Sequence, residues 1–239
     1  VNDLTVPNFG PNGEAANYAL QTKGGEEITL YGTNFGPTEF KYGLTGKNCT
    51  SGINCIVVKY GPRASDTLLY TAENCYIKER NTQIACKTVP GVGADLAFTV
   101  IIDGDVSPIS LEGIAFIPPN ITKVGLVGVV DSTLKTSGGE VIEITGTNFG
   151  PLGTLVDLVS YENNMGETVV ATNCKVTVAF TTVQCDSSPG TGKNLKFKIR
   201  FGGQDSGSFD SDIRYAKPTI TGFTVPTQPG GSGGGENTN

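Results

Sequence analysis

A fourteen-residue string occurs twice in the chain, with ten of its positions unchanged. Residues 24–37 read GGEEITLYGTNFGP and residues 138–151 read GGEVIEITGTNFGP, so the second string starts 114 positions after the first. Near-identical strings at such a separation indicate two copies of one structural unit. The repeat therefore predicts that the 239 residues form two domains of roughly 100 to 115 residues each.

The cysteines follow the same repeat. Cys75 and Cys86 recur as Cys174 and Cys185, eleven residues apart in both copies, and the offset between the copies is 99 from there on. The difference between the two offsets makes the first copy fifteen residues longer. This insertion lies between residues 37 and 75, and it contains the other two cysteines, Cys49 and Cys55.

An even number of cysteines at repeated spacing predicts disulfides in an oxidising compartment. Metal binding is the competing interpretation, but the chain has no CxxC pair and no His. Each eleven-residue closure is expected to stabilise its unit by about 3 kcal/mol. The predicted disulfides are Cys49–Cys55, Cys75–Cys86 and Cys174–Cys185.

Strand signals dominate both copies. Short apolar or alternating runs rich in β-branched residues are separated by 33 Gly and 13 Pro residues, and no window of a dozen residues has a helical apolar stripe. Many short strands over about 100 residues are typical of a β-sandwich. The sequence thus predicts an all-β chain of two tandem β-sandwiches, with strands in 28–31, 96–102, 141–145, 176–183 and 195–201.

The repeated string resembles the signature of the IPT/TIG domain. The shared features are the Gly pair, the alternation after it, the turn GTNFGP, a Pro-x-Ile-Thr opening at 119–122 and a Cys-bearing hairpin downstream. The resemblance covers roughly residues 4–117 and 118–216. It implies an immunoglobulin-like fold, which occurs in plexin and scatter-factor receptor ectodomains, in Rel-type transcription factors and in microbial surface proteins. Because the fold serves several functions, the resemblance does not select one.

The expected organisation is a first domain at 1–117 with the disulfide-pinned insertion, a second domain at 118–216, and an extra strand with a flexible Gly-rich tail at 217–239. The net charge is −6, and Lys and Arg are scattered singly. Nucleic acids and anionic membranes require clustered cations, so neither is expected as a partner. No run approaches the ~20 apolar residues of a membrane helix.

The sequence offers little for catalysis. Without His, a serine hydrolase would need a Lys base, and we expect no catalytic residue and no cofactor. The strings 103–105 (Asp-Gly-Asp) and 210–212 (Asp-Ser-Asp) each place two carboxylates close together, at about the same place in the two units. A Ca²⁺ loop needs more oxygen ligands and a distal Glu. We therefore interpret both strings as turns, where Asp and Gly are favoured, and expect no metal site.

Two glycosylation sequons occur. Asn48-Cys49-Thr50 lies on the insertion and Asn120-Ile121-Thr122 lies at the junction of the units. Both are predicted glycan acceptors if the protein is secreted from a eukaryotic cell. The run GGSGGG at 230–235 lacks the Lys-Ser/Thr partner of a phosphate-binding loop and is predicted to be a flexible tail.

The opening strand of the second copy has a third occurrence. Its pattern, Ile121-x-x-Val124-x-Leu126, recurs 99 residues later at Ile220, Phe223 and Val225. The first copy has a weak opening, with only Leu4, Val6 and Phe9 available. One interpretation is a longer array cut inside a third unit. The other is strand donation, in which 218–226 completes the first unit of the next molecule by β-augmentation and builds an open filament.

These features predict a non-enzymatic extracellular or cell-surface protein with a structural or adhesive role. Its partners are expected to be other copies of itself or neighbouring repeats, together with a protein or glycan ligand for which the insertion at 49–55 offers a surface. A receptor ectodomain fragment that captures a protein ligand is the alternative. A third class, the accessory module of a polysaccharide-degrading enzyme, predicts aromatic platforms, and the chain has no Trp and only scattered Tyr.

Overall fold

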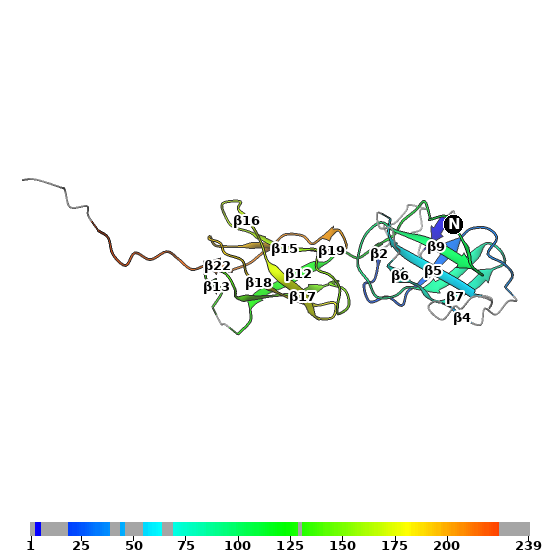
Figure 1. Cartoon of the computed structure of the whole chain (residues 1–239), viewed down its shortest axis with the longest axis horizontal. Coiled ribbons are helices and arrows are strands. Elements are labelled where there is room, and N and C mark those ends of the chain that lie inside the picture. Colours follow the sequence, from blue (N-terminus) through cyan, green and yellow to red (C-terminus); the bar gives the residue numbers. More distant parts are fainter. Residues whose placement is uncertain are drawn as a thin grey trace, which may run out of the picture.

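A computed structural model describes residues 3–5, 19–38, 44–45, 55–63, 69–128 and 131–224. The described residues form strands and loops without a helix, and hence without a helix that could span a membrane. Figure 1 shows two β-sandwiches placed end to end along the long axis of the molecule. The prediction of an all-β chain built from β-sandwiches is confirmed. We call strands β1–β11 unit one and strands β12–β22 unit two.

Unit one contains two facing sheets and a short parallel pair. The first sheet has the order β1-β3-β8-β7, and the second has the order β10-β9-β5-β4 with β6 paired to β5. The parallel pair joins β2 to β11. The strands are β1 (Asp3–Thr5), β2 (Ala19–Leu20), β3 (Glu27–Tyr31), β4 (Leu44–Thr45), β5 (Cys55–Pro62), β6 (Tyr70–Thr71), β7 (Glu73–Glu79), β8 (Gln83–Lys87), β9 (Leu96–Ile102), β10 (Asp105–Val106) and β11 (Ala115–Phe116).

Unit two repeats this arrangement. One sheet has the order β12-β14-β18-β17, the other has the order β16-β15-β19-β20 with β21 paired to β19, and β13 pairs with β22 in parallel. The strands are β12 (Asn120–Leu126), β13 (Thr133–Leu134), β14 (Val141–Thr147), β15 (Leu158–Glu162), β16 (Thr168–Val170), β17 (Thr172–Val178), β18 (Thr182–Asp186), β19 (Lys196–Phe201), β20 (Gln204–Asp205), β21 (Phe209–Asp210) and β22 (Arg214–Tyr215).

The repeated string folds in the same way in both units. Its first glycine, Gly138 in unit two, has φ 72°, and a Cβ there would lie 2.6 Å from the backbone of the facing loop, so only glycine fits. The alternating apolar residues of β14 then point into the sandwich, as the period of a strand requires. Asn148 follows in the left-handed region at φ 66°, and Phe149 folds back into the core over Gly146.

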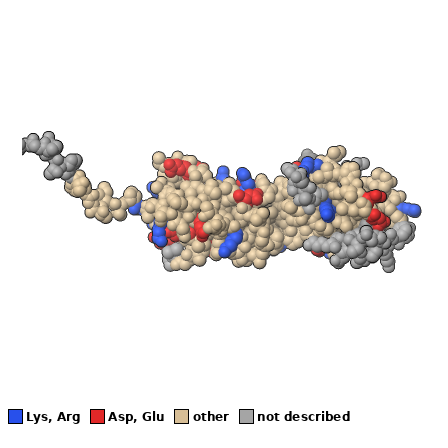
Figure 2. Space-filling view, viewed as in Figure 1, with Lys and Arg blue, Asp and Glu red and all other residues tan. Residues whose placement is uncertain are grey.

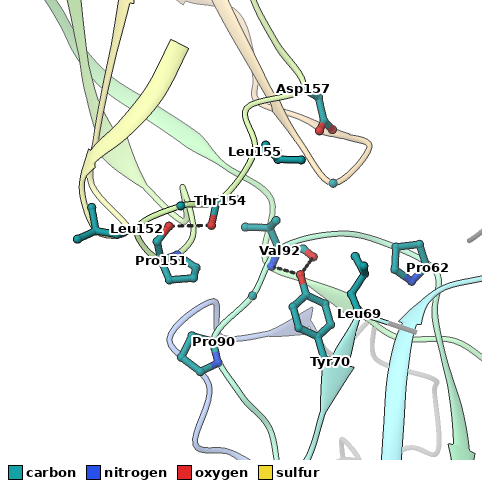
Figure 3. Close-up of a pocket in the computed structure, with 13 residues that line it drawn as sticks. Pro62, Leu69, Tyr70, Pro90, Val92, Pro151, Leu152, Thr154, Leu155 and Asp157 are labelled. Carbon is teal, nitrogen blue, oxygen red and sulfur yellow. Dashed lines mark hydrogen bonds between the residues drawn. The ribbon is translucent and has the colours of Figure 1, made fainter. Parts of the chain in front are cut away.

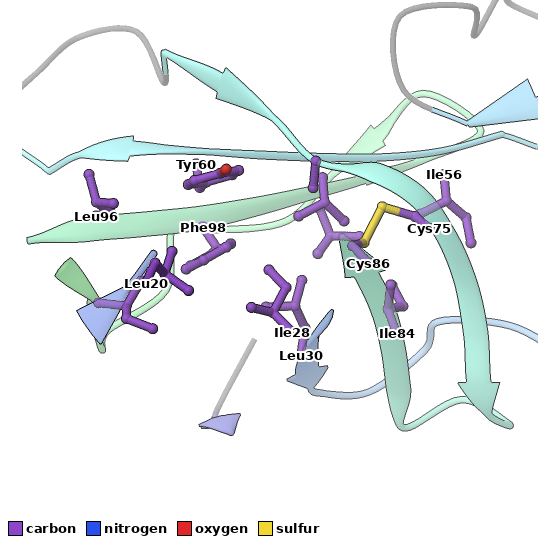
Figure 4. Close-up of a cluster of buried hydrophobic side chains, with 14 of the residues drawn as sticks. Leu20, Ile28, Leu30, Ile56, Tyr60, Cys75, Ile84, Cys86, Leu96 and Phe98 are labelled. Carbon is purple, nitrogen blue, oxygen red and sulfur yellow. A yellow bond between two sulfur atoms is a disulfide. The ribbon is translucent and has the colours of Figure 1, made fainter. Parts of the chain in front are cut away.

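Each unit has its own core. In unit one, Ile28 and Leu30 of β3 pack against Tyr60 and Phe98 of the opposite sheet, and Figure 4 shows these side chains together with the disulfide. In unit two, the corresponding cluster contains Tyr161 and Phe197, whose ring centroids lie 5.0 Å apart. A fully buried large apolar side chain contributes about 1.5–3 kcal/mol, so each unit has the means to hold its own fold.

The opening strand of the first copy is shorter than that of the second, with three residues against seven. The weak opening of the first copy nonetheless forms β1, which pairs with β3 so that Leu4 lies opposite Leu30. In unit two, β12 pairs with β14 so that Val124 lies opposite Ile144, which is the equivalent register. The spacing Val1-x-x-Leu4-x-Val6 in the sequence therefore matches the opening pattern of the second copy at an offset of 120, because the segment between β1 and β3 has more residues than the segment between β12 and β14.

Candidate functional site at the junction and the free ends

The described residues contain no group of three or more His, Cys, Asp or Glu side chains that could hold a metal ion. A Ser-x-x-Lys string does occur at residues 132–135, on and beside β13. Residues three apart on a strand point to opposite faces, and the ammonium of Lys135 is directed to Glu140 at 3.7 Å. The side chain of Lys135 is 80% exposed, so this string lacks the buried serine–lysine contact that nucleophilic catalysis requires.

The two carboxylate pairs do not occupy equivalent places, contrary to the sequence-based expectation. Asp103 and Asp105 form the turn between β9 and β10, and the equivalent residues of unit two are Gly202 and Gln204. Asp210 lies at the end of β21, where its carboxylate pairs with Lys196 at 3.7 Å. The misassignment arose because both strings lie between apolar segments, and only the strand pairing reveals which turn each one belongs to.

The junction between the units is a direct contact. The loop after β8 of unit one reaches the turn between β19 and β20 of unit two, where Ala94 N donates to Gly202 O at 3.3 Å. Gly202 has φ 52°, and a Cβ at this position would lie 2.5 Å from the Cα of Gly93. Val92 packs against the core cluster of unit two. Close packing at this point therefore depends on the absence of a side chain on Gly202, whereas a Cβ on Gly93 would meet no atom closer than 3.5 Å.

Side chains of unit two bind the carbonyls of the connecting segment. Asn148 Nδ2 donates to Pro118 O at 3.1 Å, and Gln204 Nε2 donates to Phe116 O at 2.9 Å. Thr22 Oγ1 of unit one lies 3.4 Å from Asn148 Oδ1. Two prolines in the connection restrict φ, and these hydrogen bonds fix the carbonyls beside them. The two prolines are evident from the sequence, whereas the roles of Asn148 and Gln204 are not, because these roles depend on contacts between the units.

Two further interactions hold the turn of unit two that meets unit one. Asp157 Oδ2 accepts a hydrogen bond from Gly203 N at 2.8 Å. Arg200 binds Asp205 through two hydrogen bonds of 2.7 and 2.8 Å, and the first of these contacts is also an ion pair. These hydrogen bonds keep the pKa of the Asp205 carboxyl below its usual value. The turn is thus braced by its own strand pair and by the loop before β15.

A groove of about 360 Å³ opens beside the junction. Unit one contributes Leu69 and Tyr70, unit two contributes Leu152 and Leu155, and the three leucines are largely exposed. Figure 3 shows the Tyr70 hydroxyl bound to Val92, with donor–acceptor distances of 3.0 Å to N and 2.7 Å to O. Tyr70 therefore holds the loop of unit one that meets unit two.

The far end of unit two has a pocket of about 900 Å³ where the chain leaves β22. Under the repeat, it corresponds to the end of unit one that meets unit two. Tyr215 N binds Gly192 O just as Phe116 N binds Gly93 O, with distances of 2.9 and 2.8 Å. Residues that line the pocket include Thr136, Thr191, Lys193, Arg214 and Lys217.

The predicted assembly strand follows this end. Residues 217–224 extend away from unit two without strand pairing among the described residues, and Figure 1 shows the segment projecting from the end of the molecule. Ile220 is 92% exposed and Phe223 is 88% exposed. Two apolar side chains are thus presented to solvent at the positions that in β12 are Ile121 and Val124. Val225 lies outside the described residues.

The other predicted site residues are placed as follows. The structure joins Cys75 to Cys86 and Cys174 to Cys185, in each case between neighbouring antiparallel strands with Cα atoms 4.1 Å apart. The Cys49–Cys55 pair and Asn48 lie outside the described side chains. Asn120 is exposed at the start of β12, and its glycosylation stays a prediction.

No family model and no curated protein matches the chain. Solved structures that are similar include SGBP-B from a complex xyloglucan utilization locus in Bacteroides uniformis, with 11% identity and a TM-score of 0.31 over 90% of this chain and 48% of that one. The plexin A4 extracellular region has 18% identity and a TM-score of 0.28 over 83% and 15% of the chains. The Escherichia coli adhesin FdeC has 16% identity and a TM-score of 0.32 over 90% and 64%. The chain thus spans less than two thirds of the length of each.

Proposed function

We propose that this protein is a non-enzymatic extracellular protein with a structural or adhesive role, built from tandem units of the IPT/TIG type that continue end to end into further units. Disulfides within the two units fit an oxidising compartment. The observation that carries the proposal is the exposure of Ile220 and Phe223 directly after β22. The equivalent segment after β11 is β12, the opening strand of the following unit.

The register of the two opening strands supports a specific docking mode. Because Val124 and Leu4 occupy equivalent positions, the repeat aligns Phe223 with both. The segment 218–225 of one molecule then adds to the edge of β3 in a second copy, with Phe223 opposite Leu30 and Thr224 opposite Thr29. Backbone hydrogen bonds of the new strand pair provide affinity, and alternate side chains fix the register.

The donated strand takes the place of β1. Both have the apolar spacing of an opening strand, but the donor has Phe where β1 has Leu. Burial of Ile220 and Phe223 contributes about 1.5–3 kcal/mol each before entropy losses. Donor and acceptor are different surfaces of one molecule, so the contact is heterologous and repeats into an open filament. The segment of β1 competes for the same edge, and its removal is expected to favour assembly.

The test measures the size of particles in solution by light scattering and their shape by negative-stain microscopy. The intact chain is expected to form head-to-tail oligomers, and deletion of residues 217–239 is expected to abolish them. Phe223→Asp should do the same. The matched control is Thr221→Asp, because the equivalent Thr122 is exposed in unit two. Deletion of residues 1–6 should strengthen assembly.

A chain that stays monomeric at high concentration, with or without residues 1–6, contradicts serial assembly. It would favour the alternative of a receptor or adhesin ectodomain that acts as a single molecule. Equal oligomerisation of the intact and the shortened chain would show that a surface other than the 217–239 segment drives association. Loss of assembly in Thr221→Asp as well as in Phe223→Asp would remove the assigned register.

A further inference from the structure

The free end of unit two carries charges that the junction lacks. At the junction, three positions at the end of unit one are the uncharged residues Ala94, Ala115 and Pro118. The equivalent positions of unit two, 99 residues later, are Lys193, Arg214 and Lys217, and all three line the end pocket. Arg214 lies 3.9 Å from Asp131. Within the described part of the chain, Lys193 and Lys217 take part in no ion pair.

The opposite end of the molecule, at unit one, carries acidic residues where the junction has uncharged ones. The turn of unit two that receives unit one reads Gly-Gly-Gln at 202–204, and the equivalent turn of unit one reads Asp-Gly-Asp at 103–105. The backbone is the same in both, with φ 50° at Asp103 and 52° at Gly202. Asp103 and Asp105 are exposed. Unit two forms the same turn with uncharged residues. The backbone conformation of the turn therefore does not depend on the two carboxylates of unit one.

We propose that the basic end of unit two binds the acidic 103–105 turn of a second copy, in the arrangement that joins the two units within one chain. The inference rests on the serial assembly proposed above and names the surfaces that meet in it. Ala94 N and Gly202 O lie 3.3 Å apart at the internal junction, and the repeat puts Lys193 and Asp103 at these positions. Lys193 then faces the turn, with Lys217 on the connection beside it.

The proposed junction between two molecules, which we call the copied junction, retains one neutral contact of the junction between units one and two. Asn34 is the equivalent of Asn148 and has the same left-handed backbone, with φ 63° against 66°. Asn148 donates to Pro118 O, so Asn34 is placed to donate to the carbonyl of Lys217 in the other copy. Gln204 donates to Phe116 O, whereas Asp105 has no proton to donate. Its carboxylate instead adds to the negative charge that faces the basic end.

The copied junction must be wider than the internal one. A Cβ on Gly202 would lie 2.5 Å from the Cα of Gly93, and Asp103 has a Cβ. The two faces therefore separate by about 1 Å to restore van der Waals distance. The ends are not uniform in sign, because Asp212 lies among the basic residues of the end pocket. Figure 2 shows blue and red residues together at both ends, with red residues near the base of the tail and a blue residue at the tip of the opposite end.

Opposite charge on the two ends gives the assembly a direction. Two basic ends or two acidic ends repel each other, so head-to-head and tail-to-tail contacts are disfavoured. The internal junction needs no such selection because the connecting segment already fixes the order of the units. Assembly is expected to weaken as salt rises, since exposed charges are screened beyond about 8 Å at physiological ionic strength.

The test is a charge swap measured by sedimentation of the intact chain. The double substitution Lys193→Glu with Lys217→Glu is expected to raise the dissociation constant roughly tenfold. Asp103→Asn with Asp105→Lys on the other end should weaken assembly in the same way, and Asn suits the left-handed position. A chain with all four substitutions has complementary ends again and should regain assembly. Lys175→Glu, on an exposed position within β17, is the control for a charge reversal away from the ends.

The outcomes separate this inference from the proposed function. One outcome is that the wild-type chain assembles through residues 217–239 while the end substitutions act no differently from Lys175→Glu. That result supports the strand contact and overturns the inference that the charged ends bind each other. Failure of the four-substitution chain to recover, with its unfolding temperature unchanged, also overturns the inference. A wild-type chain that does not assemble at any concentration overturns both proposals.

Discussion

Both units fill the space beside an equivalent glycine with a tyrosine, but they take it from different strands. In unit one the residue is Tyr70 of β6, whose ring would lie 2.7 Å from a Cβ on Gly91. In unit two it is Tyr215 of β22, whose hydroxyl would lie 2.6 Å from a Cβ on Gly190. The position of Tyr215 is occupied in unit one by Phe116, which packs edge-on against Tyr70 at 5.6 Å.

Because the two tyrosines come from different strands, their hydroxyls have different hydrogen-bond partners. Tyr70 binds Val92, in the loop that contacts unit two. Tyr215 binds Ser188 O at 2.6 Å and lies 3.0 Å from the Tyr161 hydroxyl, so it serves the interior of its own unit. The frame of the sandwich thus fixes the space that a tyrosine fills, and the strand that supplies the tyrosine decides whether its hydroxyl holds the loop that contacts a neighbouring unit.

The largest expected effect is the loss of stability when a disulfide is removed, and this loss should be equal in the two units. Removal of Cys75 and Cys86 by Ala substitution is expected to lower the free energy of unfolding of unit one by about 3 kcal/mol, and removal of Cys174 and Cys185 should do the same in unit two, because both close eleven-residue separations. Calorimetry of the two variants measures this. A clear inequality between them would break the equivalence of the units.

High pH should destabilise both units, because each unit buries tyrosines. Burial raises the pKa of Tyr60 and Tyr70 in unit one and of Tyr215 in unit two above the usual 10.0. The folded state then retains protons that the unfolded chain loses, so stability is unchanged below pH 10 and falls above it. The slope is at most about 1.4 kcal/mol per pH unit for each tyrosine.

Unit one should therefore be the more sensitive unit, with two such tyrosines among the described residues against one. Calorimetry between pH 8 and 11 tests the order of the two transitions. Tyr215→Phe should flatten the dependence for unit two and cost about 1 kcal/mol at neutral pH through the lost hydrogen bond. An unchanged alkaline slope in this variant would contradict the assignment.

The smallest effect is expected at the junction. Gly202→Ala places a methyl group 2.5 Å from the Cα of Gly93 and should increase the separation between the units. The methyl group of Gly203→Ala meets no atom within 4 Å. Both glycines have positive φ, so the backbone cost of about 1 kcal/mol is shared and Gly203→Ala is the control. X-ray scattering in solution should show a broader range of interunit angles for Gly202→Ala only. Equal scattering from the two variants would show that close contact does not set the angle.

Much of the frame could be predicted from sequence because it depends on local rules. The Gly pair, the alternation in β14 and the left-handed Asn148 are short-range requirements, and they recur wherever the string recurs. The opening of unit one was harder to recognise, since a longer segment shifted its offset and no local rule reveals a register across that segment. The two carboxylate strings looked equivalent for the same reason, although they lie in different turns.

That the chain holds two similar β-sandwiches follows from the sequence, because near-identical strings with identical cysteine spacing impose the same strands, turns and disulfides. The sequence also marked the third opening pattern at Ile220 and Phe223. Only the tertiary structure decided which residues meet at the junction and which are their counterparts at the free ends. Those contacts join residues as far as 126 positions apart, such as Thr22 with Asn148, and side-chain patterns carry no information on such pairings until the strands are placed in space.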